Sequence, residues 1–166
     1  MGAPTPALET VITAIKAQMD TIASIGTVYT RDHNREDDGE EFFALRNATT
    51  ALLDVWYIGL ESQEAIEGPG VGENYAVYNI RIRHVSLRKG DTDWVKTARG
   101  KGQEVADKLE KNASVFRISS QPQIRTEETV TLDGYVERSS FTSEIYGPQV
   151  IVEGFVRLSV EARRWT

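Results

Sequence analysis

Residues 149–164 read QVIVEGFVRLSVEARR and form the most regular alternation in the chain. An apolar or small residue occupies every second position, and polar or larger residues occupy most of the positions between. A period of two sustained over more than a dozen residues predicts a β-strand. Strands usually have about five or six residues, so we expect part of this one to project beyond the domain. The first set is Val150, Val152, Gly154, Val156, Leu158, Val160 and Ala162.

A second long strand is predicted at residues 75–87. One face carries Ala76, Tyr78, Ile80 and Ile82, and the other face carries Tyr75, Val77, Arg81, Arg83, Val85 and Leu87. Apolar residues on the second face predict that it too is covered, by a second layer or by a partner. Further strands are predicted at residues 27–31, 41–46, 52–60, 115–118 and 128–138.

Two helices are predicted. In residues 6–25, apolar side chains recur at steps of three and four, after Thr5 as N-cap and Pro6, and before Gly26 as the stop. The second helix spans residues 94–109, with Asp91 or Thr92 as cap. Gly100 and Gly102 lie in its middle, where each costs about 1 kcal/mol relative to alanine, so this helix is either continuous or broken there.

The order helix, strands, helix, strands indicates an α+β fold. We expect an antiparallel β-sheet covered on one face by two helices, with a protruding β-hairpin made by residues 128–138 and 149–164. The length of 166 residues predicts a single domain, 1–166, with long loops at about 31–41 and 67–74.

Composition excludes several function classes. The chain has no cysteine, hence no disulfide, thiolate metal site or cysteine nucleophile. Charged residues interrupt every apolar run, and the first nine residues do not resemble a secretory signal, so no membrane association is expected and an intracellular protein is the default. The net charge is −6, from 25 acidic and 19 basic residues, which does not favour sequence-independent binding of nucleic acid.

Acidic clusters are the first candidates for chemistry. The segment Asp32–Glu41 offers carboxylates for Ca²⁺ or Mg²⁺, but it lacks the spacing of a calcium-binding loop, and a solvated loop is the better interpretation. Asp91 and Asp93 form an Asp-x-Asp pair of the kind that binds a metal phosphate. They also lie where a helix start favours acids, and capping is the better interpretation.

Histidines and glycine-rich stretches give no stronger signal. His33 and His84 have no Ser or Cys partner at an interpretable spacing, so each is interpreted as structural. Gly68–Gly72 lacks the Lys-Ser or Lys-Thr of a phosphate loop. Arg99–Gly102 is either an anion nest or a place where helix and sheet approach closely. Arg157, Arg163 and Arg164, with Trp165, are interpreted as a solvated strand end. We therefore assign no catalytic, cofactor-binding or metal-binding residue.

The order of elements resembles that of bacteriophage tail terminator and tail-completion proteins, which belong to the head–tail joining (neck) region. The resemblance is carried by the helix from Leu8 to Ile22, the strand Asn74–His84 that leads into the helix from Asp93 to Leu109, and the final pair of strands. It covers most of the chain and rests on architecture, not on a signature motif.

The resemblance implies a structural virion protein without catalysis, assembled in the host cytoplasm. Such a protein forms a homo-oligomer, commonly a hexameric ring, that caps the tail-tube protein and joins it to the head connector. DNA passes through the lumen without sequence-specific binding, and an acidic wall suits that passage. In a closed ring each subunit uses two different patches, and the long hairpin is the expected source of one.

Three alternatives stay open. Another neck or head-completion protein would share the same helix-on-sheet design. A small metal-dependent hydrolase or nuclease would use Asp32–Glu41 with His33 or His84. A binding module would use Arg99–Gly102 for an anionic ligand.

Overall fold

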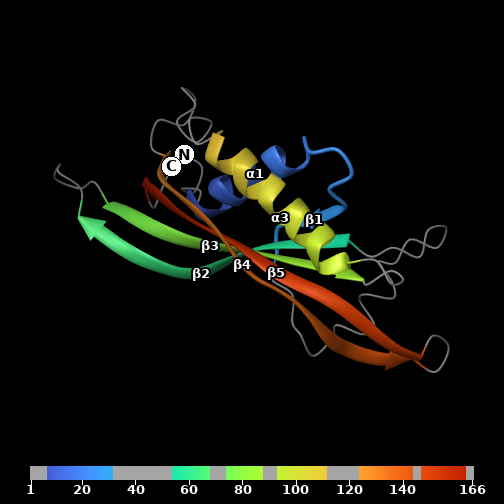
Figure 1. Ribbon diagram of the computed structural model, residues 1–166. Helices are drawn as coiled ribbons and strands as arrows, with labels where there is room; N and C mark the ends of the chain where they lie inside the picture. Colours follow the sequence, from blue (N-terminus) through green and yellow to red (C-terminus); the bar gives the residue numbers. More distant parts are fainter. Residues whose placement is uncertain are drawn as a thin grey trace.

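A computed structural model describes residues 7–31, 54–67, 74–87, 93–111, 124–143 and 147–163. These residues form an α+β fold with a five-stranded sheet, as the sequence predicts (Figure 1). The predicted strands at 41–46 and 115–118 lie outside the described residues. The elements in chain order are α1 (Ala7–Met19), β1 (Thr27–Tyr29), β2 (Asp54–Glu67), β3 (Asn74–Leu87), α3 (Trp94–Lys111), β4 (Ile124–Ser143) and β5 (Gly147–Arg163).

The sheet has the strand order β1-β2-β3-β5-β4. Neighbours from β2 to β4 are antiparallel, as expected, whereas the short β1 pairs with β2 in parallel, from Thr27↔Val55 to Tyr29↔Tyr57. The sheet is therefore mixed and not wholly antiparallel. A parallel pair needs a crossover of about a dozen residues or more, and residues 30–53 between β1 and β2 are enough for one.

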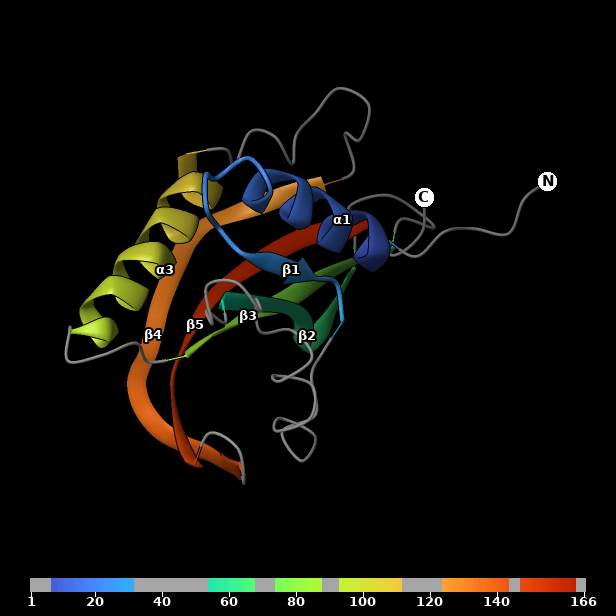
Figure 2. The same cartoon turned by 90° about the vertical axis from the view of Figure 1, so that its right-hand side faces the viewer.

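Both helices lie on one face of the sheet, as predicted (Figure 2). α1 buries Val11, Ile15 and Met19 but ends at Met19, earlier than the predicted stop at Gly26. α3 is continuous through Gly100 and Gly102, so the predicted alternative of a break does not occur. Asp93 caps α3, because its carboxylate accepts a hydrogen bond of 3.1 Å from the amide of Lys96.

The main core lies between the helices and the sheet. It joins the inward faces of α1 and α3 to alternate residues of the central strands, among them Trp56, Ile80 and Val156. A second cluster covers one end of the opposite face and contains Val55, Tyr57, Val85, Leu87 and Ile151.

The second face of β3, for which the sequence predicts cover by a second layer or by a partner, is covered at its described apolar positions. Val85 is fully buried and Val77 is 8% exposed within the chain itself. The alternation of the sequence correctly placed apolar residues on both faces of β3. The alternation does not show whether the same chain or a second chain covers those residues.

The predicted hairpin protrudes from the sheet. The pairing of β3 with β5 starts at Leu87↔Ile151, whereas β4 and β5 remain paired beyond that point, to Ser143↔Gly147. Residues 139–143 and 147–150 therefore form a two-stranded extension past the end of β3, and it reaches beyond α3 (Figure 1). We call this segment the hairpin extension.

A buried ion pair joins the two central strands on the face away from the helices. The Arg83 guanidinium lies 2.6 Å from the Glu153 carboxylate, through both Nε and Nη2. Both side chains are about 5% exposed. Removal of one partner from such a pair leaves a buried charge without its counterion, which costs far more than the loss of an exposed pair.

We predict that Glu153→Ala lowers the free energy of unfolding by about 3–5 kcal/mol, because Arg83 stays buried without its main counterion. Chemical denaturation measures the change. The double variant Arg83→Met/Glu153→Leu should recover most of the loss. Asp20→Ala removes an exposed pair with Lys16 and should cost less than about 0.5 kcal/mol. Equal losses in the Glu153 and Asp20 variants would contradict the prediction.

Candidate functional site

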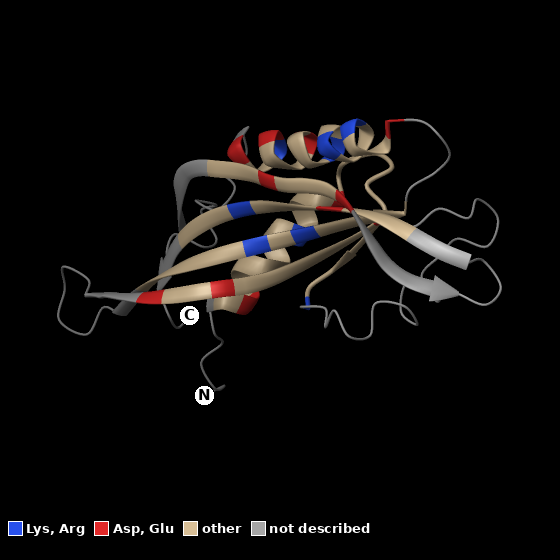
Figure 3. Cartoon of the chain, turned by 60° about the horizontal axis from the view of Figure 1, so that its bottom comes forward, with Lys and Arg blue, Asp and Glu red and all other residues tan. Residues whose placement is uncertain are grey.

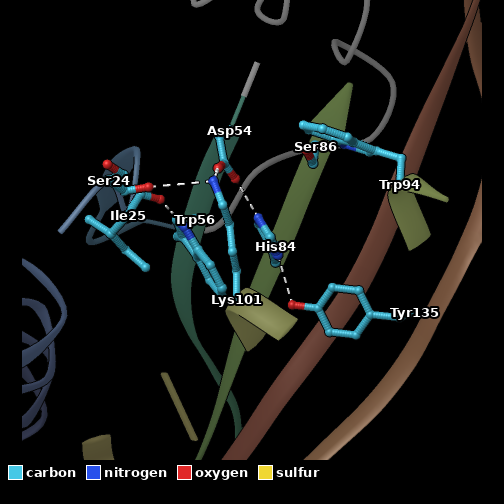
Figure 4. Close-up of polar contacts among 9 residues, drawn as sticks. All are labelled: Ser24, Ile25, Asp54, Trp56, His84, Ser86, Trp94, Lys101 and Tyr135. Atoms are coloured by element: carbon cyan, nitrogen blue, oxygen red, sulfur yellow. Dashed lines mark hydrogen bonds and ion pairs between the residues drawn. The ribbon is translucent and has the colours of Figure 1, made fainter. Parts of the chain in front are cut away.

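A cluster of polar side chains lies beneath α3, at the end of the sheet where β2 begins (Figure 4). His84 of β3 is its centre and has no exposed surface. Its Nε2 lies 2.5 Å from Oδ1 of Asp54, and its Nδ1 lies 2.7 Å from the hydroxyl of Tyr135. A carboxylate only accepts, so Nε2 carries the proton, and the tyrosine hydroxyl donates to Nδ1. Both ring nitrogens are therefore satisfied in the neutral form of the imidazole.

Trp56 of β2 packs flat on the imidazole ring. The two ring centroids are 3.7 Å apart and the planes are inclined by 3°. The indole N–H donates a hydrogen bond of 2.7 Å to the carbonyl of Ile25, in the turn that leads into β1. Trp56 thus fixes the orientation of His84 and ties that turn to the sheet.

Lys101 connects α3 to the cluster. Its Nζ forms an ion pair with Oδ2 of Asp54 and lies 3.4 Å from the carbonyl of Ser24. Arg99–Gly102 is helical throughout, so its amides belong to the helix and form no anion nest. The competing interpretation, a close approach of helix and sheet, is the correct one for Gly102.

Tyr135 reaches His84 because of a β-bulge in β4. Asp133 pairs with Phe155 and Val136 with Glu153, so two residues of β4 face the single residue Gly154 of β5. The first of the two is Gly134, with φ of +75°, a conformation that glycine adopts without strain. The extra residue turns Tyr135 toward the helices.

The ring of Tyr135 occupies a slot between two glycines. A Cβ atom on Gly102 would lie 2.7 Å from Cζ of the ring, and a Cβ on Gly154 would also collide with it. Gly102 belongs to α3, and Gly154 is the register partner of His84 on β5. Both glycines therefore make room for the aromatic ring.

Burial sets the protonation of the cluster. Desolvation lowers the pKa of His84 below its ordinary value of 6.5, although the hydrogen bond to Asp54 and the charge of that carboxylate act in the opposite direction. The positive charge of Lys101 lowers the pKa of His84 further. Burial, with a smaller contribution from Asp54, raises the pKa of Tyr135 well above its usual range. His84 is therefore neutral and Tyr135 protonated near pH 7.

The cluster has the geometry of a structural clamp. Its members come from β2, β3, α3 and β4, and the fully buried His84 offers no surface to a substrate. Two hollows in the described part of the chain lie away from the cluster, one around Arg157 and Ser159 on the sheet and one around Ile22 and Glu104 beside α3.

The structure settles some of the residues selected from the sequence. His84 lies fully buried in the cluster, and Asp93 is a helix cap. Within the described ranges, no three His, Asp or Glu side chains are grouped to hold a metal ion. Arg157, interpreted as part of a solvated strand end, instead lies within β5 and forms ion pairs with Glu61 and Asp133, whereas Arg163 is the last residue of β5. The other selected positions lie outside the described residues: Asp32–Glu41 with His33, Gly68–Gly72, Asp91, Thr92, Arg164 and Trp165.

Sequence reasoning missed Asp54, Trp56 and Tyr135 as partners of His84. The available signals were two glycines, Gly102 in the helix and Gly154 in the regular strand, because glycine inside an element often marks a close approach of another group. No known protein family and no curated protein sequence gives a significant match to the chain. Neither α1 nor α3 is long and apolar enough to cross a membrane.

We predict opposite effects for alanine at the two glycines of α3. A Cβ on Gly102 collides with Tyr135, so Gly102→Ala should lower the free energy of unfolding by about 1–3 kcal/mol. Gly100 has no atom within 4 Å of the added carbon. Gly100→Ala should therefore raise the free energy of unfolding by about 0.5–1 kcal/mol, the helix-propensity gain. Denaturant melts of both variants test this, and the same sign of change in both would refute it.

The neutral state of His84 predicts a loss of stability in acid. In the unfolded chain a histidine binds a proton below about pH 6.5, whereas folded His84 resists protonation until a lower pH. The unfolded state then binds more protons, so the free energy of unfolding falls as pH drops through this window, by up to about 1.4 kcal/mol per pH unit.

The comparison with His84→Gln isolates this effect, because every other titrating group is present in both proteins. We expect a shallower dependence of the free energy of unfolding on pH between about 6.5 and 5 in the variant than in the wild type. Urea titrations at several pH values measure both slopes. Parallel slopes would show that His84 does not contribute.

Proposed function

We propose that this protein is a structural subunit of a tailed-phage virion that forms a ring at the head–tail junction and caps the tail tube, as a tail terminator does. The observation that carries the proposal is the hairpin extension. An isolated two-stranded hairpin is only marginally stable in water. A strand pair that continues past its third neighbour, between 139–143 and 147–150, is well suited to lie against an adjacent subunit.

Two further features support the proposal. The polar cluster around His84 is closed and serves to hold the fold together, which suits a structural subunit better than a catalyst. The net charge of −6 suits a ring whose lumen lets DNA pass without adhesion. The partners under this proposal are other copies of the chain, the tail-tube protein and the head connector, in the virion and, during assembly, in the host cytoplasm.

We predict that the purified protein forms rings, commonly hexamers, whose population rises with concentration. Native mass spectrometry over a concentration series measures the stoichiometry, and negative-stain images show whether the largest species has a central hole. Replacement of residues 140–149 by Asn-Gly closes the hairpin with a two-residue turn after the pair Ser139↔Val150. This variant should stay folded and lose the ring.

The shortened variant must keep the circular dichroism spectrum of the wild type for its result to count. A wild type that stays monomeric at high concentration would refute the proposal of a ring. If the shortened variant still forms rings, the proposal of a ring stands, but the hairpin extension is not the contact between subunits.

A further inference from the structure

The sheet face away from the helices carries a short strip of two arginines and one phenylalanine. Arg81 of β3 and Arg157 of β5 are register partners. Their guanidinium carbons lie 5.4 Å and 5.1 Å from the centre of the Phe155 ring. All three side chains are partly exposed. We call this set the arginine strip.

The arginine strip places two positive charges directly opposite each other, an arrangement that disfavours the isolated sheet. Arg157 has counterions on both sides: Asp133 of β4 at 2.5 Å and Glu61 of β2 at 3.3 Å. Arg81 has none among the described residues, and its only recorded contact there is the ring of Phe155. The strip therefore leaves one guanidinium available for a carboxylate from outside the subunit.

The strip has the composition of a protein-binding hot spot. Arginine and aromatic side chains are enriched where binding energy concentrates. Stacking on Phe155 orders Arg81 in advance, which reduces the entropy lost on binding. Val136 is the only large hydrophobic side chain in the described ranges that is exposed, so the described surface offers contacts that depend on charge more than on apolar area.

A patch of the opposite charge lies on the helix side of the same subunit. A hollow between the end of α1 and the second half of α3 is lined by Glu104 and Asp107, together with Thr21, Ile22, Ala23 and Lys108. Glu104 is exposed and has no recorded cation partner in the described part of the chain. Asp107 accepts a hydrogen bond of 2.8 Å from Gln103 and no other interaction is recorded for it. We call this the acidic hollow.

We propose that the arginine strip of one subunit binds the acidic hollow of a second copy of this chain, with Arg81 opposite Glu104. The helix layer covers one face of the sheet (Figure 3). The strip lies on the other face, because Arg81 alternates with Ile80 and Ile82, which belong to the core under the helices. Two different patches on two sides of a subunit give a head-to-tail contact, which repeats from copy to copy and closes into a ring when the rotation permits. This inference rests on the proposed function and assigns it a specific contact.

The charges beside the strip disfavour DNA as its partner. Arg157 is bordered by Glu61 of β2 and by Asp133 of β4. A duplex presents a continuous row of phosphates, which would meet these carboxylates as well as the arginines. A single carboxylate on a protein surface can contact the guanidinium of Arg81 without lying against the neighbouring carboxylates.

A charge exchange tests the contact. Arg81→Glu and Glu104→Arg each place like charges across the interface, and each should weaken assembly at least about tenfold in its dissociation constant. The double variant Arg81→Glu/Glu104→Arg restores opposite charges and should assemble within about threefold of the wild type. Sedimentation velocity over a concentration series measures all four proteins.

Arg99→Glu is the matched control, since Arg99 is an exposed arginine of α3 with no recorded contact. Arg99→Glu changes the net charge by the same amount as Arg81→Glu, and it should assemble like the wild type. Thermal melts establish that each variant is folded.

Wild-type assembly in both single variants would overturn this contact and leave the proposed ring intact. Weakened single variants without recovery in the double variant would also overturn it, because the two residues would then not face each other. If Arg81→Glu abolishes retention of duplex DNA in a gel and leaves assembly unchanged, the strip binds DNA instead. A wild type that never assembles would overturn both the contact and the ring.

Discussion

The ring of Tyr135 lies between Gly102 of α3 and Gly154 of β5, and its hydroxyl donates a hydrogen bond to Nδ1 of His84. This contact sets the distance between helix and sheet, because neither glycine can carry a side chain while the ring is present. It also completes the second hydrogen bond of a fully buried imidazole. An unsatisfied polar group in that position would cost about 1–3 kcal/mol. The close approach of α3 to the sheet and the neutral state of His84 both depend on it.

Asp54 extends this constraint to the end of the sheet where β2 begins. Its carboxylate accepts a hydrogen bond from His84 of β3 and forms an ion pair with Lys101 of α3. One carboxylate of β2 therefore contacts both β3 and α3. Gly26 lies against the backbone of Asp54 with φ of +92°, and an added Cβ there would collide with the Asp54 carbonyl. The turn before β1 can therefore approach the first residue of β2 closely, and this approach allows β1 to pair in parallel.

The sequence predicts most of the fold because its elements are long and their periods are clear. The alternation in residues 149–164 and 75–87, and the helical patterns in residues 6–25 and 94–109, correctly give two helices on one face of a sheet with a projecting hairpin. The parallel pairing of β1 was not predictable, because three residues carry no signal of direction. The continuity of α3 through two glycines was also undecided, since tertiary contacts outweigh intrinsic propensity.

The polar cluster was largely beyond prediction for a different reason. His84, Asp54 and Tyr135 are separated by 30 and 51 positions, and no periodic pattern links them. Tyr135 reaches the helix side only because the bulge adds one residue to β4, and a bulge changes the face of every residue that follows it. Gly102 in the helix and Gly154 in the regular strand were the local signs of a close approach there.

The bulge in β4 also connects the two faces of the subunit. On the helix side it directs Tyr135 into the glycine slot. On the other side Gly134, without a Cβ, leaves room for the ring of Phe155, since an added carbon would lie 3.2 Å from Cδ2 of that ring. The guanidinium groups of Arg81 and Arg157 in turn lie over the ring of Phe155. A single inserted residue therefore fixes both the clamp that holds α3 and the arginine strip that we propose as a contact between subunits. A rigid clamp beneath such a strip reduces the conformational entropy that assembly would otherwise cost.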